Sequence, residues 1–424
     1  MEKKSDSYDL THLFRHSYGK VLAVLIKRFG PAHLEDIEDA IQEALIKAMR
    51  IWPYQDIPVQ PFAWLLKVAH NQLIDQLRKK QKTVLSGEIF ENNLVNDLIN
   101  DPTLENTIDD DQLKMIFTCC HPSLSEESQI ILTLKLIAGF SNGEVANALL
   151  KKEDTVAKAF TRAKRKLQDE NIRFDHAFEI GLRSRLNIVL RIIYLIFTEG
   201  YKPYEGNSSI KKDLCYEAIR LALLLDNNKF CQTASTKALI ALMCFHTARF
   251  EARQGPGGEL IDLEHQDRSI WNQELINIGI RYLNAATDKS DYPLDYILQA
   301  FISYYHCSAE RFVDTDWKSI LRLYDIHLTK QYSPVIALNR IVAFSKVHGI
   351  APAYQLLLAY EQNDDAPKQM LFHAIKGELL SKLGRNHEAA EAFQKAVVLG
   401  ENAPEINHLK HKISSLIYRD RNHS

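Results

Sequence analysis

Apolar residues recur every three or four positions along almost the whole chain, whereas the alternating pattern typical of β-strands is scarce. In residues 155–168 the positions on this spacing are Val156, Phe160, Ala163 and Leu167. Such spacing places apolar side chains on one face of an α-helix. The 16 glycines and 13 prolines lie mostly between the periodic runs. The sequence therefore predicts an all-α protein.

Differences in charge divide the chain into four segments. Residues 8–82 carry several amphipathic helices and end in the basic run RKKQK, and residues 114–170 are helical again. Between them, residues 83–113 contain eight acids and no Lys or Arg, which predicts a flexible acidic linker. From residue 175 to residue 424 the pattern predicts a long series of helices.

One stretch of the C-terminal segment has the spacing of a helical repeat. GELLSKLGRNHEAAEAFQKAV places small and aromatic residues as a tetratricopeptide repeat does, at Gly377, Gly384, Ala389, Phe393 and Ala396. Small residues allow two antiparallel helices to approach, and Phe393 is expected to fill the gap between them. We therefore expect a tetratricopeptide-like helical array over residues 175–424.

The stretch KKEDTVAKAFTRAKRKL (151–167) concentrates positive charge. Seven of its seventeen residues are Lys or Arg, although the whole chain has 52 basic and 54 acidic residues. The cations lie opposite the apolar face of the predicted helix. Just upstream, Ser141 and Glu144 have the spacing of a capping box that begins a short helix. The pair predicts a helix-turn-helix whose second helix binds DNA in the major groove, with a solvated surface helix as the alternative.

A second basic helix follows an acidic one near the N-terminus. In PFAWLLKVAHNQLIDQLRKKQK (61–82) the apolar stripe is accompanied by polar residues on another face and a basic end. The preceding helix, DIEDAIQEALIKAMRIW, presents mostly acidic residues outside its apolar stripe. An acidic helix beside a basic helix suggests that one small domain binds two different partners.

These motifs, in this order, resemble an extracytoplasmic-function sigma factor of RNA polymerase. The resemblance rests on EDIEDAIQEALIKAMRIW, PFAWLLKVAHNQLIDQLRKKQ and GFSNGEVANALLKKEDTVAKAFTRAKRKL, and it covers residues 8–170. Further stretches, among them IFTCCHPSLS and GELIDLEHQDRSIWN, resemble a subgroup with a long tetratricopeptide-like C-terminal extension. The turn ALLKKEDTV departs from the family, because Leu149 and Leu150 stand where many members have glycine.

The resemblance implies two partners, the core RNA polymerase and promoter DNA, and no cofactor. The residues that it implies for core binding are Asp36, Glu38, Asp39, Gln42 and Glu43. Those implied for the −10 element are Trp52, Tyr54, Lys67, Asn71, Arg78, Lys79 and Lys80. Those implied for the −35 element are Lys151, Lys152, Thr155, Lys158, Thr161, Arg162, Lys164 and Arg165. The extension is expected to bind a protein partner or itself.

Composition and the remaining motifs favour a soluble cytoplasmic protein. No apolar run is long enough to span a membrane, and six cysteines in 424 residues suggest reduced thiols. Cys119, Cys120 and His121 are adjacent and without a CxxC partner, so we expect a packed helix end and no metal site. The acids of GELIDLEHQDRS favour ion pairs or a solvated loop over catalysis.

Two other functions remain open at this stage. One is a tetratricopeptide scaffold, or another regulator, with an incidental helix-turn-helix, and the acidic helix at 35–47 argues against it. The other is an enzyme in the C-terminal half.

Overall fold

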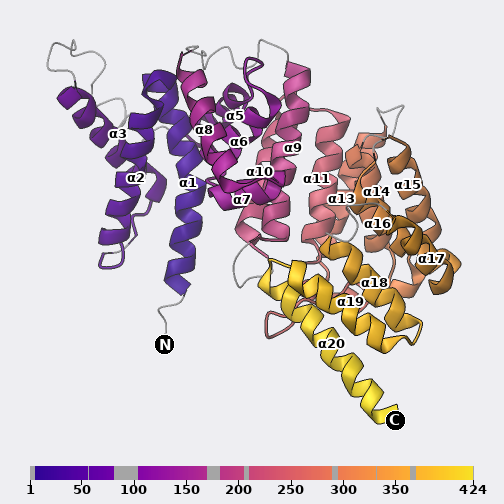
Figure 1. Ribbon diagram of the computed structural model, residues 1–424. Helices are drawn as coiled ribbons and strands as arrows, with labels where there is room; N and C mark the ends of the chain where they lie inside the picture. The colour runs from indigo at the N-terminus through magenta and orange to yellow at the C-terminus, as the bar shows by residue number, and fades with distance from the viewer. Residues whose placement is uncertain are drawn as a thin grey trace. The chain divides into compact units, whose positions relative to one another are not determined.

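The computed structural model describes residues 5–55, 57–80, 104–169, 182–204, 210–288, 295–330, 332–362 and 369–423. Within these ranges the chain forms helices and no strand, with one isolated bridge between Gln254 and Leu260. The predicted all-α fold is thus confirmed (Figure 1). None of the helices in this part of the chain combines the length and apolar content needed to cross a membrane.

Two compact units make up the chain. Unit 1 contains residues 1–196 and 227–231, and unit 2 contains residues 197–226 and 232–424. Helix α9 (Leu182–Tyr201) contributes its larger part to unit 1 and its last turn to unit 2.

Unit 1 holds two helical bundles. The first bundle comprises α1 (Ser5–Phe29), η1 (Pro31–His33), α2 (Leu34–Ile51) and α3 (Pro61–Lys80). The second bundle comprises α5 (Leu104–Cys119), α6 (Glu126–Leu136), α7 (Asn142–Leu149) and α8 (Glu153–Asp169). In the first bundle α2 packs against α3, and buried Ile37, Ile41 and Leu66 belong to its core. Proline at the first position of α3 suits a helix start, because that position needs no N–H donor.

Helix α5 corrects the predicted linker. The prediction placed a flexible acidic segment at 83–113, but α5 begins at Leu104. Asp111 is only 2% exposed, and both of its carboxylate oxygens accept hydrogen bonds from Lys27 Nζ, at 2.8 and 3.1 Å. An acid that is paired in this way can be buried, which a count of charges does not reveal. The rest of the predicted linker, residues 83–103, lies outside the described residues.

The predicted start of the extension also differs from the structure. Arg185, 11 residues beyond the predicted limit of 174, is buried in unit 1 and donates from Nη1 to the Phe117 carbonyl at 3.0 Å. Its guanidinium also lies over the Phe117 ring, 5.5 Å from the centroid. The first turns of α9 therefore belong to the packing of the second bundle.

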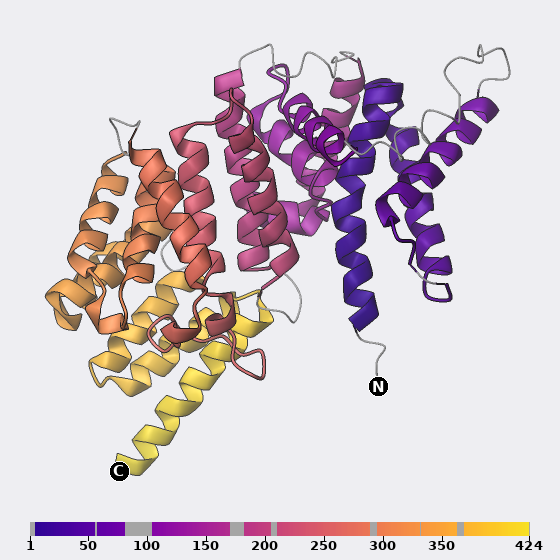
Figure 2. The ribbon, with the colours of Figure 1, turned by 180° about the vertical axis from the view of Figure 1, so that it is seen from behind.

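Unit 2 is a series of antiparallel helix pairs (Figure 2). Its elements are α10 (Lys212–Asn227), α11 (Ala234–Thr247), α12 (Phe250–Arg253), η4 (Arg268–Ile270), α13 (Gln273–Thr287), α14 (Asp295–Ser308), η5 (Phe312–Asp314), α15 (Trp317–Lys330), α16 (Pro334–His348), α17 (Ile350–Tyr360), α18 (Met370–Lys382), α19 (Asn386–Leu399) and α20 (Ala403–His423). Neighbours in sequence pack on one another from α13 to α20.

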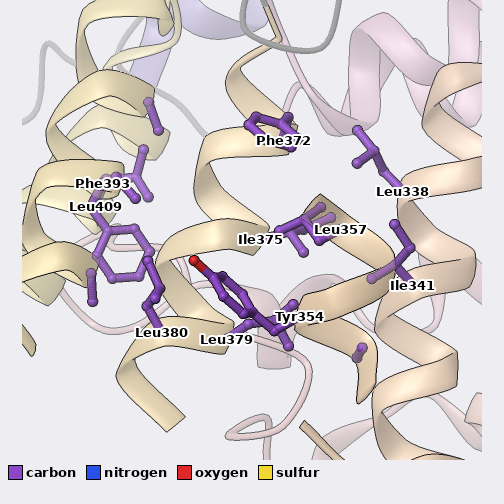
Figure 3. Close-up of a cluster of buried hydrophobic side chains, with 14 of the residues drawn as sticks. Leu338, Ile341, Tyr354, Leu357, Phe372, Ile375, Leu379, Leu380, Phe393 and Leu409 are labelled. Atoms are coloured by element: carbon purple, nitrogen blue, oxygen red, sulfur yellow. The ribbon is translucent and has the colours of Figure 1, made fainter. Parts of the chain in front are cut away.

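The repeat motif lies in the α18–α19 hairpin. A Cβ atom added to Gly377 would lie 2.6 Å from ring carbons of Phe393, so only glycine allows this approach. Ala389 and Ala396 are 0% exposed and Phe393 is 2% exposed, as their spacing predicted. Figure 3 shows Phe393 and Leu409 on one side of this core, Leu338 on the other, and residues of α18 between them.

Candidate nucleic-acid interface

The predicted helix-turn-helix is formed by α7 and α8. Ser141 caps α7 by accepting a hydrogen bond from Glu144 N, and the Glu144 carboxylate accepts one from Ser141 N. This confirms the predicted capping box. Helix α7 ends at Leu150, which has the left-handed values φ 53° and ψ 48° and is 92% exposed. Lys151 N then bonds to the Ala146 carbonyl at 2.8 Å, which closes the turn before α8 begins.

Helix α8 has one buried and one cationic face. The buried residues are Val156, Ala159, Ala163 and Leu167, while Phe160 is half-buried beneath Lys135 and Lys164. The exposed residues from the set implied for the −35 element are Lys151, Lys152, Thr155, Lys158, Thr161, Arg162 and Arg165. Because these side chains lie on one surface, the helix can present several cations to a phosphate backbone at once.

Lys164 differs from the other seven residues of that set. Its side chain is 17% exposed, and its Nζ lies 2.9 Å from Glu38 Oε2. Glu38 belongs to α2 and is one of the residues implied for core binding. The structure therefore pairs Lys164, implied for the −35 element, with Glu38, implied for core binding. Neither side chain is fully exposed.

The acidic face of α2 is partly exposed and partly paired. Asp39, Gln42 and Glu43 are exposed, and the amide of Gln72 donates to the Glu43 carboxylate. Asp36 is half-buried and pairs with Lys80, the last residue of α3. Acids at the start of a helix also interact favourably with the helix dipole, which supports the position of Asp36 in the first turn.

Most residues implied for the −10 element are exposed around α3. Lys67, Asn71, Arg78, Lys79 and Lys80 are exposed on that helix, and Tyr54 in the preceding loop is 89% exposed. Trp52 is a correction, because it is 4% exposed. Its ring packs against Trp64 and Phe14, with centroid distances of 5.3 and 5.7 Å. In this structure Trp52 forms part of the core and is not presented to DNA.

Two apolar residues beside Tyr54 were missing from the sequence prediction. Ile57 is 46% exposed and Val59 is 101% exposed, in the loop between α2 and α3. An exposed apolar group is costly in water and is suited to contact with an unstacked base. The signal was present in the sequence as apolar residues between prolines, but from this loop only Trp52 and Tyr54 were named for the −10 element.

The Cys–Cys–His motif forms a helix end. Cys119 and Cys120 are 0% exposed, and burial raises the pKa of Cys120 to about 12 and that of Cys119 well above its ordinary value. His121 Nδ1 lies 2.9 Å from Ser123 Oγ, and Ser125 caps α6. In the described ranges no three His, Cys, Asp or Glu side chains come together as a metal site would require.

The acidic loop of unit 2 contains ion pairs, one of the two arrangements that we expected. Asp262 lies 3.0 Å from His408 Nε2 and 2.7 Å from Lys412 Nζ. Burial alone would raise the pKa of Asp262, but the hydrogen bonds from His408 and Lys412 hold it well below its ordinary value. Glu264 lies 3.1 Å from Nζ of both Lys346 and Lys382. These carboxylates join the loop to α16, α18 and α20.

Three family matches cover separate parts of the chain. Residues 13–83 match Sigma-70 region 2, and residues 114–167 match Sigma-70 region 4. Residues 185–287 match a family of unknown function, DUF6596. An uncharacterized protein of Rhizobium meliloti (strain 1021) is 34% identical over 404 residues, covering 94% of this chain and 93% of the relative. No solved structure matches the chain.

Proposed function

Because the chain belongs to the sigma-70 family, as an extracytoplasmic-function-like sigma factor with an extra C-terminal region, we propose that charged faces of three helices carry its two binding reactions. The protein directs RNA polymerase to promoters through its sigma regions 2 and 4. The proposal assigns core binding to the acidic face of α2. It assigns promoter binding to the exposed polar faces of α3 and α8.

The cationic face of α8 is the observation that carries the proposal. Its apolar face is fully used in the second bundle, so the exposed cations are not needed for folding. Lys and Arg on one helix face release counterions when they neutralise phosphates, and arginine can also read guanine in the major groove. The Asp39 and Glu43 side chains on α2 would repel phosphates, and they suit a basic protein surface instead.

Core binding is tested by reversing charge on α2. We expect the double variant Asp39→Lys, Glu43→Lys to bind core polymerase at least tenfold more weakly than wild type while unfolding at the same temperature, because both side chains are exposed. A matched control reverses Glu310 and Glu401, which are exposed in unit 2 outside its helices. Equal core affinity of the two double variants would show that α2 is not the docking surface.

For unit 2 we propose a tetratricopeptide-like array that binds a protein. In this proposal the binding sets the level of transcription from the promoter. The tight α18–α19 hairpin and the sequential antiparallel packing support this proposal. The loop carboxylates Asp262 and Glu264 are engaged in ion pairs, which favours binding over catalysis. A protein that binds polymerase and DNA would act in the cytoplasm.

A further inference from the structure

A buried arginine, Arg249, lies between α11 and α12 and is 9% exposed. Its Nε donates to the side-chain oxygen of Gln266 at 3.2 Å, and its guanidinium stacks on the Trp271 ring, 5.4 Å from the centroid. Among the described residues no carboxylate lies within 4.0 Å of this guanidinium. A buried charge is costly unless an opposite charge compensates it. Arg249 is therefore a group whose burial calls for an anion.

Two more arginines bring positive charge to the same region. Arg268 also stacks on Trp271, 4.7 Å from the centroid, and its Nη1 donates to two carbonyl groups at the end of α14, at 2.6 and 2.8 Å. Arg253 lies 3.6 Å from the centroid of the Tyr201 ring and donates to the carbonyl group of Tyr201, the last residue of α9, at 2.8 Å. The carbonyl groups of a helix end carry only about half a negative charge. Both arginines therefore keep positive charge for a further partner.

Other groups nearby do not supply the missing negative charge. Burial lowers the pKa of Arg268, and the charge of Arg249 lowers it further. Asp314, whose charge also reaches Arg268, pairs with Arg311 at 2.7 Å. Burial, together with the charge of Arg249, lowers the pKa of His246 and of His306 to about 3. Both imidazole rings are therefore neutral at pH 7 and can donate without adding charge.

Hydrogen-bond donors around Arg249 also require acceptors. Trp271 Nε1, Arg268 Nε, His246 Nδ1 and His306 Nδ1 are buried and have no hydrogen-bond partner among the described residues. Trp271 is only 3% exposed, and its indole N–H can donate but cannot accept. Buried donors of this kind almost always have an acceptor. Cations without an acid and donors without an acceptor point to the same chemistry, an oxyanion.

We propose that unit 2 binds a phosphate group at Arg249. A phosphate accepts hydrogen bonds through oxygens that point in several directions, which suits donors from α11, η4 and α14, whereas the two oxygens of a carboxylate lie in one plane. Its charge also suits several guanidinium groups, which bind phosphate through their planar fork of donors. Arg253 and Tyr201 are half-buried, so the cluster reaches the molecular surface beside them.

The proposed site gives a role to a motif that promoter binding leaves unused. Gln266, Arg268 and Trp271 belong to GELIDLEHQDRSIWN, and Tyr201 ends the α9 helix. All the residues of the site except His306 lie within 185–287, the range that matches a family of unknown function. The proposal needs neither polymerase nor DNA, so it stands or falls independently of the sigma function.

Calorimetric titration of the full-length protein with sodium phosphate tests the site, with sodium chloride keeping the ionic strength constant. We expect saturable binding in wild type. Arg249→Gln should weaken it by about tenfold or more, because hydrogen bonds to a charged group are among the strongest. The matched control Arg322→Gln removes an exposed arginine of α15 and should bind as wild type does. Saturation is the required sign, because phosphate also stabilises folded proteins without binding to a site.

A second variant covers the case in which Arg249→Gln does not fold. Trp271→Phe keeps an aromatic ring beside the arginines and removes only the Nε1 donor, so we expect weaker phosphate binding with an unchanged circular dichroism spectrum. Glycerol phosphate distinguishes two sources of the group. If it binds more tightly than inorganic phosphate, the group belongs to a larger organic ligand, and equal affinity indicates free phosphate. Either result supports the site.

Three results would overturn the proposal. The first is the lack of saturable binding of both phosphate compounds to wild type. The second is equal phosphate affinity of wild type and the folded variants at Arg249 and Trp271. The third is saturable binding of sodium acetate in the same titration without binding of phosphate, which would make the ligand a carboxylate.

Discussion

Replacing Arg162 and Arg165 with alanine should change how promoter binding depends on salt. Six cations of α8 and its turn were implied for the −35 element, and two of them are paired in the structure, Lys151 with Glu127 and Lys164 with Glu38. In the described part of the chain the other four, Lys152, Lys158, Arg162 and Arg165, are exposed and have no carboxylate within ion-pair distance. They are therefore available to phosphates and base edges.

The magnitude follows from this number of cations. Neutralising four phosphates gives a slope of log K against log salt of about −3.6, and removing two cations reduces its size by about 1.8. Each arginine that also reads a base contributes about 1–3 kcal/mol, a factor of roughly 5 to 150 in affinity. Substituting Lys152 should instead weaken binding to all sequences equally, if it contacts only phosphate.

The measurement is a salt titration of promoter binding with polymerase containing the wild-type or the double-variant sigma factor. The matched control replaces Arg183 and Arg322, which are exposed outside α8, so that the same charge is lost elsewhere. We expect the control to keep the wild-type slope and sequence preference. If the α8 variant also keeps both, α8 is a solvated surface helix and does not read the promoter.

Three further predictions concern stability. Leu150→Gly should stabilise the second bundle by about 1 kcal/mol in urea unfolding, because glycine adopts the left-handed conformation without the cost to leucine; no gain would mean that the turn relaxes in solution. Phe393→Ala should destabilise unit 2 by about 3–5 kcal/mol, with Val398→Ala, 76% exposed at the end of α19, as the near-neutral control. The lowered pKa of Asp262 means that its carboxylate contributes stability above its ordinary pKa of 3.8, and this contribution is lost as the pH falls; Asp262→Asn should therefore flatten the acid end of a plot of unfolding free energy against pH, and an unchanged curve would show that the ion pairs add nothing.

The sequence was sufficient for predictions that depend on local spacing. The capping box of Ser141 and Glu144 and the buried face of α8 follow from residues within a few turns of each other, and the structure has both. The packing of Gly377 against Phe393 followed from the tetratricopeptide-like spacing of these two residues. In each case the partners are close in sequence, on one helix or on the two helices of one hairpin, so that short-range spacing is enough to predict them.

The errors arose where a distant residue determines exposure. Trp52 was assigned to the −10 element because the family resemblance implied it, yet Phe14 and Trp64 from other helices cover it. Asp111 was assigned to a solvated linker because its neighbours are acidic, but Lys27, 84 positions away, pairs with it. Arg185 was placed in a separate extension because the helical pattern restarts there, and its partner is the carbonyl of Phe117. Charge and periodicity do not specify such long-range partners.

Two of these partnerships, those of Arg185 and Asp111, hold three helices of unit 1 together. Arg185 ties the start of α9 to α5, and Asp111 ties α5 to α1, so α5 is held from both sides by buried or half-buried charge. Removing one member of such a pair leaves the other desolvated and unpaired, which costs more than the pair itself contributes. Helix α5 therefore links the start of α9 to α1. Helix α9 itself begins in unit 1, and its last turn belongs to unit 2.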